Sequence, residues 1–186
     1  MRYVRGRVLD VGAGAGRVAL HLQERGHEVV AIDISPGAVE VCRRRGVRDA
    51  RVMRFEDVDA SLGTIDTVVM FGNNFGLFAG PRKGATMLRR LHRLTSRRGR
   101  IVAESRGVYD TDDPSHLAYH ERNRNRGRMA GELRIRVRHR QLATPWFDYL
   151  IVSQDEMRDL VDGTGWAISR FLPGDGGIYT AVIDKV

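Results

Sequence analysis

The 186-residue sequence has a single cysteine, Cys42, and only two lysines. One cysteine excludes an internal disulfide, and no group of cysteines and histidines has the spacing of a zinc site, so we expect no metal. No apolar run approaches the ~18 residues of a membrane-spanning helix, and the first residues lack the apolar core of a secretory signal. We therefore expect a cytoplasmic protein with no membrane partner.

Acidic residues are scarce in one segment of an otherwise balanced chain. The sequence has 31 basic and 23 acidic residues, a formal net charge of +8. Residues 122–140 contain eight arginines and one acid, Glu132, so this segment carries most of the excess. Because the basicity is local, the high net charge does not by itself indicate binding to nucleic acid.

The first hundred residues alternate short apolar runs with helical patterns. Apolar runs bounded by glycine or charge are typical of buried parallel strands. We expect such strands at residues 8–11, 29–32, 50–54, 67–71 and 100–104. A helix is expected between the first two strands, a second after Ser35 and Pro36, and a third over 81–97. This alternation predicts an α/β fold with a parallel sheet.

The alternation stops at residue 106. Residues 106–130 are polar, and we expect them to form a loop. Residues 132–142 alternate apolar side chains with arginines, which predicts a half-buried strand. Thr144 and Pro145 predict a turn into a second strand over 146–152, so we expect a hairpin. A capping box at 153–156 then opens a helix, and two strands follow, at about 166–172 and 178–184.

A glycine-rich turn directly after the first strand is the strongest functional signal. Asp10, Gly12, Gly14 and Gly16 form the pattern D-x-G-x-G-x-G. Glycines there let the backbone approach a ligand, and the following helix N-terminus favours polar or anionic groups. The dinucleotide pattern G-x-G-x-x-G would need a glycine at Arg17, so the spacing is a different one.

Two acidic positions follow the next strands. Asp33 ends the second strand, 21 residues after Gly12, where a carboxylate can accept both hydroxyls of a ribose. The alternative role, a cap for the next helix, is already filled by Ser35. Glu56 and Asp57 follow the third strand, where they could accept from an adenine amino group or form a solvated turn.

Together these residues resemble the class I S-adenosylmethionine-dependent methyltransferases, over residues 4–105 and 153–186. The resemblance implies S-adenosyl-L-methionine as cofactor and a doubly wound, mostly parallel seven-stranded sheet whose last strand is antiparallel. To this we add the expected β-hairpin insert after strand five. We expect one methyltransferase domain: a cofactor-binding half (1–105), an insert (106–152), and a C-terminal helix and strands (153–186).

The resemblance also assigns roles to residues. The glycines would pack against the methionine and ribose portions of the cofactor, Asp33 would bind the ribose hydroxyls, and Ile34 would cover an adenine face. The turn after strand four would lie beside the transferable methyl. The expected cofactor-binding residues are Asp10, Gly12, Ala13, Gly14, Gly16, Asp33, Ile34, Phe55, Glu56, Asp57, Phe71 and Gly72.

Catalytic groups are harder to assign, because methyl transfer is an in-line displacement in which positioning can suffice. A base is needed only where the acceptor must lose a proton. The candidates are Asn73 as a polar pocket residue, with Asn74 beside it, and Glu104 and His116 as bases, with His120 as a further choice. Each histidine could equally be solvated in a polar loop. Cys42 lies on the second helix, away from the ligand edge, which argues against a cysteine nucleophile.

The acceptor and the role of the insert stay open. We expect a small-molecule acceptor, because the arginine segment contains no aromatic residue for base stacking. The alternatives are a non-catalytic cofactor-binding module and an RNA methyltransferase that uses the arginines. The insert 106–152 is expected to close over the site as a lid, or else to serve as a dimerisation hairpin.

Overall fold

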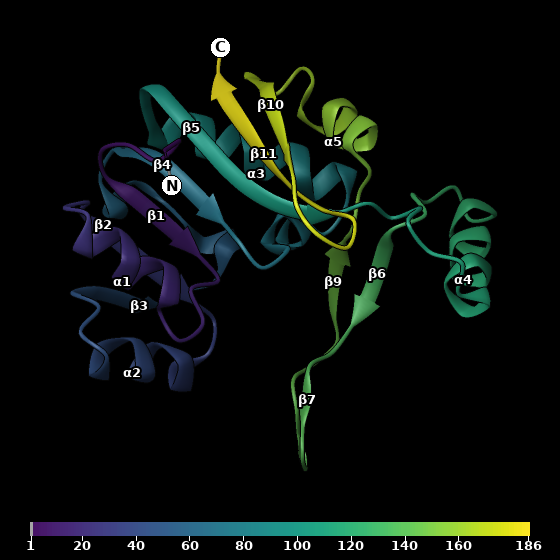
Figure 1. Cartoon of the computed structure of the whole chain (residues 1–186), viewed down its shortest axis with the longest axis horizontal. Helices are drawn as coiled ribbons and strands as arrows, with labels where there is room; N and C mark the ends of the chain where they lie inside the picture. Colours follow the sequence, from purple (N-terminus) through teal and green to yellow (C-terminus); the bar gives the residue numbers. More distant parts are fainter. Residues whose placement is uncertain (1) are drawn as a thin grey trace.

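A seven-stranded sheet forms the centre of the structure, a computed structural model that describes residues 2–186 (Figure 1). Its strands are β1 (Val8–Val11), β2 (Val29–Asp33), β3 (Asp49–Val52), β4 (Ile65–Met70), β5 (Thr95–Arg106), β10 (Trp166–Pro173) and β11 (Ile178–Lys185). Their order in the sheet is β10-β11-β5-β4-β1-β2-β3. The first five strands are parallel, and β11 is antiparallel to both β5 and β10. The predicted sheet with its antiparallel last strand is confirmed.

Helices cover both faces of this sheet. They are α1 (Arg17–Glu24), α2 (Pro36–Arg44), α3 (Pro81–Leu94) and α5 (Gln154–Val161). One buried cluster joins α1 and α2 to the sheet, and the other joins α3 and α5 to it. The fold is therefore doubly wound, as predicted.

The third helix and fifth strand meet earlier than expected. The helix ends at Leu94 rather than at residue 97, and β5 starts at Thr95 rather than at residue 100. Thr95 has an extended backbone with φ of −95° and ψ of 151°, which ends the helix, and its hydroxyl donates to the Leu91 carbonyl at 2.9 Å. The sequence did not show the start of this strand, because the exposed Arg97 and Arg98 interrupt the alternation of apolar and polar residues.

The expected loop 106–130 contains a helix, α4 (Pro114–Arg124), so that prediction was wrong. Asp113 caps it by accepting from the Ser115 amide at 2.7 Å. The helix was missed because it has no apolar stripe; its buried residues are His120 and Asn123. The signal that could have found it is the Asp-Pro pair at its start.

Two short antiparallel ladders follow α4. β6 (Glu132–Ile135) pairs with β9 (Phe147–Leu150), and β7 (Arg138–His139) pairs with β8 (Leu142–Ala143). The turn lies at Arg140 and Gln141, not at the expected residues 144–145. Arg140 has a positive φ of 53° there. The strand expected to be half buried over 132–142 is exposed beyond residue 136, because the chain leaves the body at that point (Figure 1).

The carboxyl ends of β1, β2 and β4 meet at one edge of the sheet. Three short 3-10 turns lie in the connections: η1 (Phe55–Asp57), η2 (Ala60–Leu62) and η3 (Asn74–Phe78). Within residues 2–186, no helix is long and apolar enough to cross a membrane, and no cluster of acidic, histidine or cysteine side chains has the makeup of a metal site.

Candidate functional site

The glycine-rich turn after β1 is tied to the end of β2. The amides of Gly12 and Ala13 donate to the Ile32 carbonyl at 2.9 and 3.0 Å. The Gly14 amide donates to Oδ2 of Asp33 at 2.9 Å. The second carboxylate oxygen of Asp33 accepts from the Ser35 amide at 2.8 Å. Asp33 therefore organises the turn and the start of α2 at once.

Gly14 and Gly16 of this turn have different surroundings. A Cβ on Gly14 would meet no atom within 4 Å, so its Cα faces open space. A Cβ on Gly16 would lie 2.7 Å from a Val47 methyl and 3.0 Å from the Cys42 sulfur. Both have positive φ, at 54° and 78°. Gly16 thus lets α2 pack closely, whereas Gly14 presents bare backbone outwards.

Cys42 lies nearer to the site than its place in the sequence indicated. Its thiol donates to the Gly14 carbonyl at 3.0 Å, from beneath the turn. Desolvation raises the pKa of Cys42, and the charges of Asp10 and Asp33 raise it further. The thiol stays protonated and supports the turn, so the expectation that Cys42 is no nucleophile agrees with its surroundings.

The turn after β4 is held from two sides. The Asn74 side-chain amide donates to the carbonyls of Val11 and Gly12 at 2.9 and 3.1 Å. Glu104, on β5, accepts from the amides of Gly72 and Asn73 through one carboxylate oxygen. These contacts join the ends of β1, β4 and β5.

A cavity of about 250 Å³ lies between the two turns. Its lining residues are Asp10, Gly12, Ala13, Arg17, Val18, Phe71, Gly72 and Asn74. The sequence predicted six of these residues for the site, and it missed Arg17 and Val18. Both begin α1, so their place directly after the last glycine was the signal that could have identified them.

Asp10 carries the most unusual electrostatics of this cavity. Its side chain is 2% exposed, and its Oδ2 has no hydrogen-bond partner within residues 2–186. Burial raises the pKa of Asp10 to about 7, and the Asp33 charge adds to the effect. The Ala19 amide and the Arg17 charge act in the opposite direction. A buried oxygen without a partner beside a cavity indicates a place for a donor from a ligand.

The residues expected around an adenine are only partly brought together. Ile34 is 64% exposed, next to Asp33 at the end of β2. Phe55 is buried instead, with its ring 5.3 Å from that of Phe78 in an edge-to-face contact, so it belongs to the core. Glu56 and Asp57 line a separate open hollow of about 500 Å³ against α3.

The three expected bases, Glu104, His116 and His120, do not line the cavity. One oxygen of Glu104 is held by the two turn amides, so this residue positions the turn. His116 is exposed on α4, where its Nδ1 pairs with the Thr111 hydroxyl at 2.9 Å. His120 is buried beside Tyr109, and desolvation lowers its pKa. None of the three lines the cavity.

Asn73 and Tyr149 form a contact that sequence reasoning missed. Asn73 has a φ of 63°, and its side-chain oxygen is buried with no partner in the described chain. The backbone carbonyl of Asn73 accepts a hydrogen bond from the Tyr149 hydroxyl at 2.5 Å. Burial, together with the Glu104 charge, raises the pKa of Tyr149 to about 12, so the phenol remains a donor. No local pattern marks Tyr149, which reaches the site from β9.

Comparison with known proteins agrees with the methyltransferase family that the sequence resembles. Residues 8–99 match the family described as "Methyltransferase domain". The chain is similar to a SAM-dependent methyltransferase from Bacteroides fragilis solved with S-adenosyl-L-homocysteine: 31% identity, TM-score 0.81, covering 97% of this chain and 73% of that one.

Two curated relatives match over shorter stretches. A 2-heptyl-1-hydroxyquinolin-4(1H)-one methyltransferase from Mycobacteroides abscessus is 35% identical over 77 residues, which cover 37% of this chain and 34% of the relative. A demethylmenaquinone methyltransferase from Thermus thermophilus is 36% identical over 104 residues, 52% of this chain and 45% of the relative. The matches thus span less than half of these relatives. With the fold, the glycine turn and the Bacteroides similarity together, the chain belongs to the class I S-adenosylmethionine-dependent methyltransferases.

Proposed function

We propose that this chain transfers a methyl group from S-adenosyl-L-methionine to a small-molecule acceptor. The observation that carries the proposal is the cavity between the glycine turn and the turn after β4, with the unpartnered Asp10 oxygen beside it. In open α/β sheets, ligands bind outside the carboxyl ends of the strands, and this cavity lies there.

The residues present fit this cofactor. The unpartnered oxygen of Asp10 can accept from its ammonium group, and the open face of Gly14 admits its bulk. Each oxygen of Asp33 already accepts one amide, but a carboxylate oxygen has two acceptor sites, so ribose hydroxyls can still bind. Ile34 offers an exposed apolar side chain for a base.

The bound cofactor supplies an electrophilic methyl on a sulfonium. The chain then has to orient the acceptor and exclude water. Asn73 does not line the cavity itself, but it lies between Gly72 and Asn74, which do. Its buried side-chain oxygen lacks a partner, and in this proposal it accepts from an O–H or N–H of the acceptor. Glu104 and Tyr149 hold the Asn73 backbone, and in this proposal they are positioning residues.

The insert 106–152 closes the acceptor side in this proposal. Its strand β9 already contacts the turn after β4: a Cβ on Gly76 would lie 2.3 Å from the Tyr149 ring. A lid that packs on the turn beside the cavity would keep water from the transferable methyl.

A small-molecule acceptor is favoured over RNA. None of the eight arginines of 122–140 lines the cavity, within the chain that the structure describes. The names of the two curated relatives, a hydroxyquinolinone and a demethylmenaquinone methyltransferase, both specify small organic molecules. A cytoplasmic location is part of the same proposal.

Two measurements test the proposal. Calorimetry with S-adenosyl-L-methionine measures cofactor binding, and radiolabelled cofactor incubated with separate metabolite and RNA pools measures transfer. We expect binding, with label in metabolites. Label confined to RNA would reverse the acceptor assignment, and binding without transfer to either pool would favour a non-catalytic module.

A further inference from the structure

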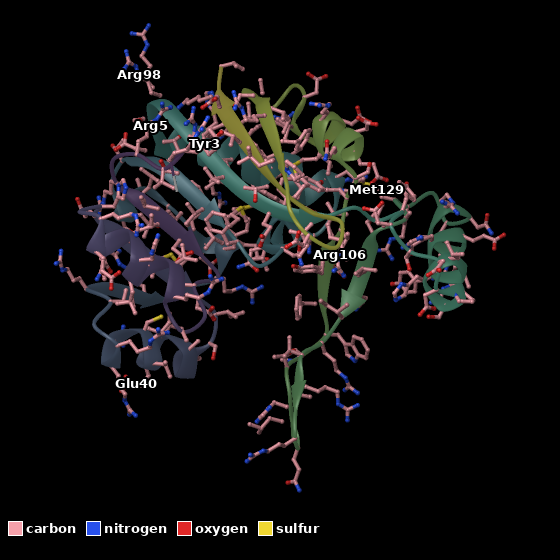
Figure 2. All side chains as sticks on the ribbon, viewed as in Figure 1. Tyr3, Arg5, Glu40, Arg98, Arg106 and Met129 are labelled. Atoms are coloured by element: carbon pink, nitrogen blue, oxygen red, sulfur yellow. The ribbon has the colours of Figure 1, made fainter. Side chains whose placement is uncertain are left out.

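The outer part of the hairpin in the insert has no role in the proposed site. Residues 136–146, here called the arm, extend past β6 and β9 and away from the sheet (Figure 1). Their side chains stand clear of the rest of the chain (Figure 2). The arm contains only the ladder of β7 with β8, each of two residues. No other strand within residues 2–186 pairs with β7 or β8, and an isolated two-stranded hairpin is only marginally stable in water.

The two faces of the arm differ in chemistry. Cross-strand partners share a face, and neighbours along a strand alternate. His139 pairs with Leu142, and Val137 exchanges hydrogen bonds with Thr144, so these four side chains share one face. Arg138 pairs with Ala143 on the other face. Apolar exposure is high: Val137 is 59% exposed, Leu142 74% and Trp146 54%.

The arginines of the arm are free of counter-charges. Arg128 and Arg134, at its base, pair with Glu132 and Asp148 at 3.2 and 2.8 Å. Arg136, Arg138 and Arg140 form no ion pair with any described residue; the Arg136 guanidinium lies 4.8 Å from the centre of the Trp146 ring. The arm therefore offers positive charge and apolar side chains within one hairpin, and no acid.

We propose that the arm docks on an anionic lipid surface. The anionic headgroups of such a surface would pair with the arginines, which have no counter-charge within the described chain. Its acyl region would receive the side chains of Val137 and Leu142. Tryptophan favours the interface between the two regions, and arginine reaches the headgroups while its stem stays apolar. Among residues 2–186 no helix could cross a membrane, and a peripheral contact needs none.

Other partners fit the arm less well. A second copy of this chain also carries a net charge of +8, so paired arms would repel. Nucleic acid offers phosphates but no apolar layer for Leu142, the most exposed of the arm's large apolar side chains. Of these partners, the anionic lipid surface is the one that offers both negative charge for the arginines and an apolar layer for Val137 and Leu142.

Vesicle binding of the whole chain tests this without cofactor or acceptor, so the result is independent of the proposed methyl transfer. We expect co-sedimentation with vesicles of phosphatidylglycerol and phosphatidylcholine, weak binding to phosphatidylcholine alone, and loss of binding as salt is raised. The emission of Trp146 should shift to the blue on binding. Trp166 is buried at 3% exposure, so it does not contribute to the shift.

Variants locate the contact. Replacing Arg136, Arg138 and Arg140 with Gln should lower the partition coefficient more than about tenfold. Leu142→Ser should reduce the partition coefficient and the blue shift. The matched control is Arg97→Gln with Arg98→Gln, two exposed arginines; Arg98 lies at the other end of the molecule (Figure 2). We expect less than a twofold effect from this control.

Three results would overturn the proposal. The first is no binding to anionic vesicles at low salt. The second is an equal loss of binding in the control and arm variants. The third is a chain that is dimeric or binds RNA through the arm, as shown by loss of that property in the arginine variant, without binding vesicles.

Discussion

Asp33 accepts a hydrogen bond from the Gly14 amide at 2.9 Å, across the 19 residues that separate them. The carboxylate that is expected to bind the ribose also orders the glycine turn, which in the proposed function contacts the rest of the cofactor. Its loss should therefore remove a ligand contact and loosen the cavity together.

Asp33→Ala is expected to weaken cofactor binding by at least about a hundredfold, because hydrogen bonds to charged groups contribute about 1.5–3 kcal/mol each. Calorimetry measures the affinity, and thermal unfolding reports the cost to the fold. Asp49→Ala is a matched control, since Asp49 pairs with Arg51 on β3 and makes no hydrogen bond to the turn. Unchanged affinity in the Asp33 variant would contradict the assignment.

The glycine turn offers a second comparison between two identical substitutions. Gly14→Val should prevent cofactor binding while the chain still folds, because the added side chain enters open space at a cost of about 1–2 kcal/mol for the positive φ. Gly16→Val should lower the melting temperature much more, because its Cβ would collide with Val47. Circular dichroism melts and calorimetry separate the two effects. Equal melting temperatures for both variants would refute the packing role of Gly16.

Asp10 predicts a dependence of stability on pH. Its pKa in the folded chain is about 7, above the ordinary value of 3.8, so the folded state holds a proton that the unfolded state releases. The free energy of unfolding should therefore fall as the pH rises from about 4 to above 7. Asp10→Asn, which keeps the shape and removes the charge, should stabilise the chain by about 2–4 kcal/mol at pH 8 and by little at pH 4.5.

Urea unfolding of both proteins at these two pH values measures the effect of Asp10→Asn. The same variant should bind the cofactor more weakly at pH 8, since the negative charge that would meet the ammonium group is gone. A stability difference that does not change with pH would show that Asp10 titrates normally.

Tyr149→Phe tests whether β9 positions the turn that carries Asn73. Removal of the hydroxyl leaves the Asn73 carbonyl without its donor, and we expect a turnover number lower by about fivefold or more with cofactor affinity nearly unchanged. Tyr109→Phe is the control, because its hydroxyl also has one partner, Glu156 at 2.8 Å, but that pair lies outside the cavity. Steady-state kinetics decide between the roles, and equal turnover in both variants would show that the insert does not act on the site.

Much of the sheet and its glycine turn followed from local patterns. Parallel strands buried on both faces must be short and apolar, so β1, β2 and β4 are visible as apolar runs, and Asp10 to Gly16 follow the first of them directly. The start of α2 at Ser35 and Pro36 is likewise local, since its cap bond spans three residues. These features depend on neighbours in the sequence, and the sequence predicts them for that reason.

The tertiary structure decided what each site residue contacts. Glu104 lies 32 residues from Gly72 and Tyr149 lies 76 from Asn73, so their roles depend on the order of strands in the sheet and on where the insert packs. Phe55 follows a strand in the expected place, yet the packing of Phe78 against its ring draws it into the core. The sequence determined the strands of the sheet and the chemistry of the glycine turn, because these are set by local patterns, but it did not show the helix α4, which has no apolar stripe. Only the folded chain determined that the Glu104 carboxylate holds backbone amides and that one oxygen of Asp10 is buried without a partner. Burial and desolvation depend on everything packed around a group.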